Sequence, residues 1–524
     1  MGLFLLNLPL QKSAKVRYTE RVAKGGIWME EKDFLQEIKE IEMIKEALGL
    51  LEWDAQTGMP EAASDFRGEV SGYLAGQAFS RSIGPKIKEA ITTLKPENLS
   101  EVGQEVLTFV KEEYDLNKAI PADRYEAFMK ETSKAHTAWA KARASQNFDD
   151  FKGSLSAIIS YLKEFIPLWQ KDEATAYDVL LNQYEPGMTV EKLDAIFGEV
   201  KDGIMALRAR LAEGTAPQTD FLSRKVTKAQ QKRFAETVVK ELGYDFERGR
   251  LDDTIHPFML DLNRNDARIT TRWNEHDFSM AIFGIMHEAG HGMYEQNIDP
   301  KYDHTPLSTG TSMGIHESQS LFNEIIIGSN QAFWRKQYPF FQECTEGTFD
   351  DIDFDTFYRG LKQTRASLIR IEADSLTYPL HIIIRYELEK EIFNGDVTVE
   401  ELPTRWNDKY EEYLGIRPEN DLEGILQDVH WSGGSFGYFP SYALGYMYAA
   451  QLLHAMEETV DVDAVLASQD YSPIKNWLTE HIHRYGASKK PNWLIQEATG
   501  EALNPQYLLD YLKKVYYTAY QIND

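Results

Sequence analysis

Two histidines four residues apart, with a glutamate directly after the first, constrain this chain more than any other feature. They lie in the segment from Phe283 to Tyr294, which reads FGIMHEAGHGMY. Residues four apart on an α-helix share one face, so the imidazoles of His287 and His291 can bind one divalent ion. Glu288 would then lie where it can take a proton from a water molecule at the metal, an arrangement typical of metalloproteases.

The residues around this motif favour a buried helix. Apolar side chains recur with helical spacing at Ile282, Phe283, Ile285, Met286, Ala289 and Met293. The alternative interpretation is a surface helix with two solvated histidines, and flanks this apolar disagree with it. We therefore expect a buried helix that carries a metal site.

A third protein ligand must come from elsewhere in the chain, because tetrahedral zinc with one water molecule needs three. One known arrangement adds a third histidine after the motif, but Tyr294 and Asn297 occupy its glycine and histidine positions here. Another takes a glutamate from a later helix, and Glu317, in the sequence HESQ, precedes an apolar helical run at the right distance. We predict Glu317 as the third ligand. The alternative is an ordinary first-turn glutamate, which the helix dipole favours.

A basic residue decides which end of a peptide such a site could recognise. An exopeptidase that acts on C-termini needs a fixed cation for the terminal carboxylate, and the planar fork of arginine suits this best. Arg370 is a candidate, because it lies within an apolar run with helical spacing where an unpaired guanidinium would be unfavourable. A salt bridge with Asp374, four residues later, is the alternative, and the spacing does not choose between them.

The composition narrows the range of partners and compartments. The chain has 524 residues and a formal net charge of −27, so nucleic acid and anionic membrane surfaces would both repel it. Cys344 is its one cysteine, so no intrachain disulfide can form and a reducing cytoplasm is the expected location. No apolar run reaches the roughly 18 residues that a membrane-spanning helix needs.

Residues 1–28 differ from the rest of the chain, because they are basic in an otherwise acidic sequence: Lys12, Lys15, Arg17, Arg21 and Lys24 stand against the single acid Glu20. No clear secretory signal is present. We expect a loosely ordered lead that precedes one domain of residues 29–524, and Met29 is a candidate for the true start of translation.

Hydrophobic periodicity predicts a mainly α-helical fold. Helical patterns cover residues 33–53, 70–93, 101–118, 122–143, 151–169 and 190–212, and later 371–393, 441–458 and 505–520. The clearest strand is residues 267–273, rich in β-branched side chains and just before the histidine helix. We expect it to be the edge strand of a small sheet beside the metal site, where a peptide can add by main-chain hydrogen bonds.

Several further motifs show a resemblance to a known family. They are Trp53-Asp-x-x-Thr-x-Met-Pro60, His256-Pro-Phe258, Asp266-x-Arg-x-Thr270, His316-Glu-Ser-Gln319, Ile369-Arg-x-x-Ala-Asp374 and Gly424-x-x-Gln-Asp-x-His-Trp431. With the histidine motif, and over nearly the whole chain from Met29, the sequence resembles the carboxypeptidase Taq family of zinc metallocarboxypeptidases. The resemblance implies a mainly helical fold with a deep central groove, a homodimer, and removal of single residues from peptide C-termini with broad specificity.

The resemblance also implies roles for individual residues. It suggests His287, His291 and Glu317 as metal ligands, Glu288 as general base and Arg370 as the anchor of the substrate's C-terminal carboxylate. Tyr442 is similar to the family's tyrosine that faces the scissile carbonyl, and His256, Arg268 and His430 fall in motifs that line the groove; His430 would assist Tyr442. The metal is expected to be zinc, and the same ligands accept cobalt.

Three other functions compete with a carboxypeptidase. The nearest is an endo-oligopeptidase of the same zinc type, with a groove open at both ends. An aminopeptidase is disfavoured, because the Gly-x-Met-Glu-Asn sequence that commonly binds a substrate's amino end is absent. The third is a catalytically inactive homologue that only binds peptides.

Overall fold

Helices dominate the structure, a computed structural model that describes residues 29–468 and 470–523. The basic lead 1–28 therefore lies outside the described residues, and its expected loose order is untested. The first half of the chain forms α2 Glu31–Thr57, α3 Ser64–Ser82, α4 Pro85–Thr93, α5 Glu101–Ala119, α6 Ala122–Ser145, α7 Asp149–Trp169, α8 Ala176–Tyr184, α9 Val190–Leu211 and α10 Lys228–Leu242.

Helical periodicity predicted most of these elements to within a few residues. In α2, for example, Phe34, Ile38 and Ile41 are all buried, as their three- and four-residue spacing requires. The single helix expected over residues 70–93 is wrong, because it is two helices. Pro85 has no N–H to continue the helix of α3 and instead occupies the first position of α4, after Gly84.

Along the chain, a small sheet comes between α10 and the helix that carries His287 and His291. Its strands are β1 Leu251–Asp253, β2 Met259–Asn263 and β3 Asp266–Thr271, in the order β1-β3-β2. β3 pairs in parallel with β1 (Leu251 opposite Ile269) and antiparallel with β2 (Met259 opposite Ile269). The strand expected over 267–273 therefore exists, but its expected position at the edge is wrong. It has a partner on each side, so the edges belong to β1 and β2, which are too short to give a clear signal.

The second half is again helical: α11 Phe278–Gln296, α12 Met313–Leu321 continued by a π-helix Phe322–Ile327, α13 Gln331–Cys344, α14 Phe354–Gly360, α15 Tyr378–Asn394, α16 Leu402–Leu414, α17 Pro440–Glu457, α18 Val462–Ala467, α19 Ser472–His481, α20 Pro491–Thr499 and α21 Gln506–Tyr520. The helix expected over 371–393 begins only at Tyr378, since Pro379 favours a helix start there. Arg370 lies instead in a short 3₁₀ turn, Arg370–Glu372.

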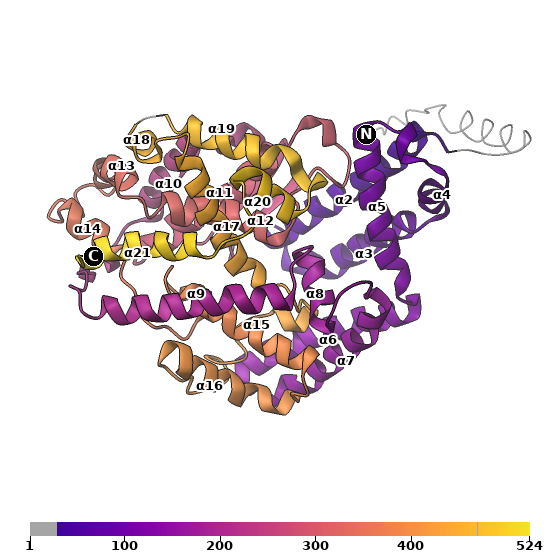
Figure 1. Ribbon diagram of the computed structural model, residues 1–524, viewed down its shortest axis with the longest axis horizontal. Coiled ribbons are helices and arrows are strands. Elements are labelled where there is room, and N and C mark those ends of the chain that lie inside the picture. Colours follow the sequence, from indigo (N-terminus) through magenta and orange to yellow (C-terminus); the bar gives the residue numbers. More distant parts are fainter. Residues whose placement is uncertain (1–28, 469, 524) are drawn as a thin grey trace, which may run out of the picture.

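The N-terminal helices α2 to α5 gather at one end of the molecule, and α13, α14 and the end of α21 lie at the other (Figure 1). Among the described residues, none of the helices combines the length and the apolar character needed to span a bilayer.

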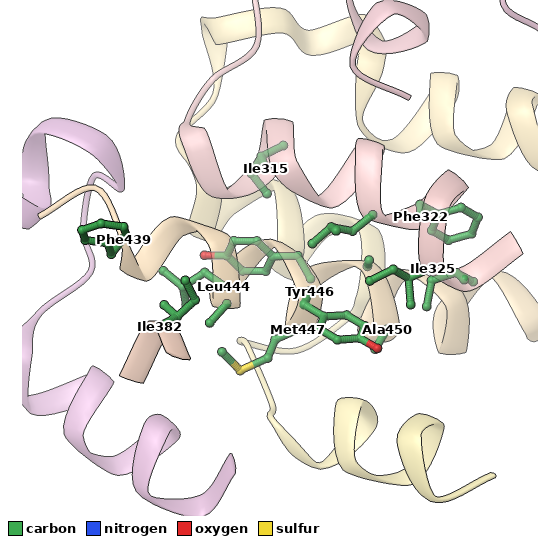
Figure 2. Packing of buried hydrophobic residues seen from close by; sticks show 14 of the residues in the cluster. Ile315, Phe322, Ile325, Ile382, Phe439, Leu444, Tyr446, Met447 and Ala450 are labelled. Carbon is green, nitrogen blue, oxygen red and sulfur yellow. The ribbon is translucent and has the colours of Figure 1, made fainter. Parts of the chain in front are cut away.

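Helix α12 lies at the centre, against both α11 and α17. Two glycines allow the close approach. A Cβ atom on Gly290 of α11 would lie 2.6 Å from Ser320 Cα, and one on Gly445 of α17 would lie 2.6 Å from Glu317 Cβ. Buried side chains of α12, of its π-helical continuation and of α17 belong to one hydrophobic core, including Ile315, Phe322, Leu444, Met447 and Ala450 (Figure 2).

Replacing Gly445 by alanine should therefore destabilise the protein, because α12 or α17 has to move. We expect a loss of about 1–3 kcal/mol in the free energy of unfolding, measured by denaturant titration. Gly153→Ala in α7 is the matched control: its added Cβ meets no atom within 4 Å, and the substitution should raise stability by up to about 1 kcal/mol. Equal effects of the two substitutions would contradict the close packing.

Candidate active site

Three side chains from two helices form a group that could hold a metal ion. His287 and His291 come from α11 and Glu317 from α12, and one ligand atom of each lies within 4.8 Å of the others. Glu317 Oε2 is 4.0 Å from His287 Nε2 and 3.7 Å from His291 Nε2. A tetrahedral ion with bonds of about 2.0–2.1 Å separates its ligand atoms by about 3.4 Å, so two imidazoles and one carboxylate at these distances fit a divalent ion.

A second carboxylate holds His287 from the other side of its ring. Nδ1 of His287 lies 2.8 Å from Oε2 of Glu324, which belongs to the π-helix that continues α12. Burial alone would lower the pKa of His287, but Glu317 and Glu324 outweigh it and raise that pKa to about 10. Surroundings that favour a proton here also favour a metal cation. The sequence analysis missed Glu324, although an acid seven residues after Glu317 in the same apolar run was a usable signal.

A chain of two residues, His316 and Glu295, orients the imidazole of His291. Its Nδ1 lies 2.6 Å from Nδ1 of His316, and His316 Nε2 lies 2.8 Å from Oε1 of the buried Glu295. Burial, aided by the positive charges of His316 and His287, keeps the pKa of His291 well below its usual value, so its imidazole is neutral. With Nδ1 engaged, Nε2 offers its lone pair to the group around Glu317.

Glu288 is buried beside His287, the first histidine of the group. It is 8% exposed, and among the described residues it has no hydrogen-bond or ion-pair partner. Burial raises its pKa to about 7, with His287 opposing and the carboxylates of Glu317 and Glu324 adding to the rise. A carboxylate without a fixed partner, next to residues that could hold a metal ion, is free to accept and release a proton.

Arg370 is the centre of a second cluster. Its Nε and Nη2 donate to Asp428 Oδ1 at 2.9 and 2.8 Å, and its Nη1 donates to the Tyr378 hydroxyl at 3.0 Å. Arg385 binds the other oxygen of Asp428 at 2.7 Å. The ion pair with Asp374 that the spacing left open is therefore absent. Asp374 instead accepts hydrogen bonds from Thr364 and from main-chain N–H groups.

Tyr442 and His430 complete this cluster. His430 Nε2 lies 3.2 Å from the Tyr442 hydroxyl oxygen, and the Arg370 guanidinium carbon is 5.0 Å from the Tyr442 ring centre. Burial lowers the pKa of His430 to about 4, so its ring is neutral, and its buried Nδ1 has no partner among the described residues. Tyr438, which the sequence analysis missed, packs edge-on to Tyr442. Burial and then the charge of Glu317 raise the pKa of Tyr438 to about 12. The electrostatic influence of Glu317 thus extends from the histidine pair to this second cluster.

The remaining predicted residues, His256 and Arg268, lie at the sheet. Arg268 binds both oxygens of Asp266 at 2.8 Å and lies 5.4 Å over the Trp53 ring, which in turn packs edge-on to Phe258. Three of the sequence motifs thus pack on one another. His256 is exposed on the loop between β1 and β2. Within the described part of the chain, no hydrogen bond or ion pair joins either residue to the histidine pair.

A cavity of about 220 Å³ adjoins the first cluster. Phe283, Glu324, Lys362 and Asp374 are among the residues that line it. Lys362 is buried there, with its Nζ 2.7 Å from Ser329 Oγ, and burial lowers its pKa to about 7.

Comparisons with known proteins agree with this geometry. The family model for carboxypeptidase Taq (M32) metallopeptidases matches residues 33–516. Carboxypeptidase 1 of Bacillus subtilis is 48% identical over 494 residues, which are 94% of this chain and 98% of that protein. Thermostable carboxypeptidase 1 of Thermus thermophilus is 35% identical over 90% of this chain and 95% of that protein. The crystal structure of the M32 carboxypeptidase from Deinococcus radiodurans R1 superimposes with a TM-score of 0.91, at 33% identity, over 94% of this chain and 99% of that one. The chain therefore belongs to the carboxypeptidase Taq (M32) family of metallopeptidases.

Proposed function

We propose that this metal-dependent carboxypeptidase removes single residues from peptide C-termini, with broad specificity for the residue removed. The observation that carries the proposal is the state of Arg370, a buried guanidinium held by Asp428 and Tyr378. Its five N–H groups make three hydrogen bonds to described residues, which leaves one N–H on each η nitrogen. Such a fork binds a carboxylate in two places, and a free C-terminus supplies a main-chain carboxylate that an amidated peptide lacks.

We propose zinc as the metal, with His287, His291 and Glu317 as its ligands, and cobalt as an ion that the same donors accept. The support is the donor set itself, together with the partners that orient each imidazole. When bound, the ion supplies Lewis acidity, which polarises the scissile carbonyl and lowers the pKa of a water molecule toward about 7.

The side chains of the protein carry the proton transfers in this proposal. Glu288 takes a proton from the attacking water molecule and delivers it to the nitrogen of the departing residue. Tyr442 donates its hydroxyl hydrogen to the carbonyl oxygen as negative charge develops there, an interaction that typically contributes about 3 kcal/mol. His430 is close enough to donate to the oxygen of that hydroxyl and so to orient it.

The other proposed features concern parts of the molecule further from the reacting bond. We propose that His256 and Arg268 bind more distant residues of the peptide in a central groove, and that residues 29–524 act as one domain within a homodimer. The family match over residues 33–516 supports the single domain. The net charge of −27 and the single buried cysteine agree with a reducing cytoplasm and with the absence of nucleic-acid partners.

The proposed activity is tested with chelator-treated protein given back zinc or cobalt. It should release the last residue of a blocked dipeptide with a free C-terminus, and not of the same dipeptide amide, as measured by chromatography. Arg370→Ala should lower kcat/KM on the free acid by roughly 100-fold, since the carboxylate loses its buried charged partner. Equal cleavage of acid and amide would favour the endo-oligopeptidase, and no cleavage of either would favour the inactive peptide-binding homologue.

Glu288→Gln should keep the metal and lose turnover. Glutamine matches the shape of glutamate but cannot accept the proton of the attacking water molecule, so we expect kcat to fall by about 10²–10⁴-fold. Metal content by mass spectrometry is measured on the same samples. Normal turnover by a metal-loaded variant would exclude Glu288 as the general base.

Glu324→Leu should weaken metal binding, because Nδ1 of His287 loses the carboxylate that orients its ring. We expect the affinity for zinc, measured by competition with a chelator, to fall by about 10–100-fold. Glu343→Leu is the control, since this glutamate is 65% exposed at the end of α13. Unchanged affinity in Glu324→Leu would show that the contact with His287 has no role in metal binding.

A further inference from the structure

The residues proposed to act on the carbonyl oxygen lie on either side of a tight turn. His430 begins a short 3₁₀ turn, His430–Gly433, and Tyr442 lies in the first turn of α17. Between them Gly434 and Gly437 have φ angles of +79° and +89°, a conformation that other residues adopt rarely. Main-chain hydrogen bonds shape this segment as far as Phe436, whose N–H donates to the carbonyl of Gly434, and the N–H of Gly437 donates to a side chain instead.

A buried carboxylate lies directly beneath this turn. Glu389 of α15 has no exposed surface. Its Oε1 accepts a hydrogen bond from Trp431 Nε1 at 2.6 Å, and its Oε2 accepts one from the main-chain N–H of Gly437 at 2.8 Å and one from the Tyr177 hydroxyl at 2.6 Å. Glu389 thus binds the turn at its first residue, Trp431, and at its last, Gly437. These residues are the sequence neighbours of His430 and Tyr438.

Helix α8 also contacts the turn from Trp431 to Gly437. Tyr177 belongs to α8, which packs against α15. A Cβ atom on Gly437 would lie 2.7 Å from the carbonyl carbon of Leu180, so the main chain of the turn lies directly against α8. The turn is therefore held between α8 and the Glu389 carboxylate, without room for a side chain at Gly437.

A carboxylate at position 389 matches the hydrogen-bonding groups around it. All three partners are donors, so the acceptor must offer two oxygens and no hydrogen. Burial of an ionised carboxyl group is unfavourable, and burial raises the pKa of Glu389 to about 7 in spite of the three donors. A group with this penalty in the core indicates a role beyond packing.

We infer that Glu389 is a positioning residue for the carboxypeptidase reaction, which holds the turn from Trp431 to Gly437 so that His430 and Tyr442 meet the carbonyl oxygen. The inference rests on the proposed function, since it takes the roles of those two residues from it. Glu389 makes no hydrogen bond to Arg370, which Asp428 and Tyr378 hold, or to His287 and His291, so loss of its contacts should affect the chemical step more than the binding of substrate or metal.

Glu389→Gln is the test, assayed in the full chain with zinc and a blocked dipeptide acid. The amide nitrogen of glutamine must face at least one of the three donors, so that contact is lost. We expect kcat to fall about 100-fold, the loss that a displacement of about 1 Å can cause, while KM and zinc content stay within about threefold of the wild-type values. Glu37→Gln is the matched control: Glu37 of α2 is also a buried glutamate whose two oxygens accept hydrogen bonds, from Arg81 and Lys86, and α2 lies with the other N-terminal helices at one end of the molecule (Figure 1).

A second substitution separates positioning from general destabilisation. In Glu389→Gln the oxygen can still serve Tyr177 and Gly437, which leaves the amide against the indole N–H of Trp431. Trp431→Phe removes that N–H, so the double variant should turn over faster than Glu389→Gln alone. Two results would overturn the inference: a loss of kcat no greater than in Glu37→Gln, or a rise in KM at unchanged kcat. Absence of turnover in the wild-type enzyme would overturn the proposed function itself, and this inference with it.

Discussion

The close packing of α12 between α11 and α17 is the contact on which the rest of the site depends. Glu317 reaches the two histidines because Gly290 allows α12 to approach α11, and Gly445 allows α17 to cover Glu317 from behind. Three helices at this distance leave no space for large side chains at the crossing. The position of the carboxylate is therefore set by the close packing of the helices that carry and cover it.

Burial of so many ionisable groups requires a partner for nearly every one of them. Glu324 serves His287, His316 and Glu295 serve His291, and Asp428 lies between Arg370 and Arg385. A buried charge without a partner would be unfavourable by several kcal/mol (about 3–5 when one member of a pair is removed), so each functional group adds a second, supporting group. Among the carboxylates of the site in the described part of the chain, Glu288 has no such partner, which agrees with its proposed task of gaining and losing a proton.

The sequence predicted the parts of the molecule that obey a local rule. The i, i+4 spacing placed His287 and His291 on one helix face, apolar periodicity located most helices, and the motifs of the family led to Arg370, His430 and Tyr442. It failed where the outcome depends on distant residues. Strand β3 is internal because two strands too short to recognise pair with it, and Arg370 lies in a 3₁₀ turn although its neighbours are apolar. Glu324 and Glu389 lie outside the motifs of the family, and the contacts on which their proposed roles depend form only when remote segments meet.

The difference between the predicted and the missed residues has a physical origin. The proposed site has to bind a metal ion and also to hold the end of a peptide. Binding a small ion needs donors a few ångströms apart, and one helix turn supplies two of them, so the metal group lies on regular helices. Holding a peptide end and its carbonyl needs groups spread over a longer distance and aimed at one point. In the proposed function Arg370 and the turn after His430 provide them, from segments that consist of short 3₁₀ turns and irregular chain. The buried carboxylates of Asp428 and Glu389 add side-chain hydrogen bonds that tie these segments to the core, and the proposed function therefore assigns the precision of the irregular part of the site to acids set back from the substrate.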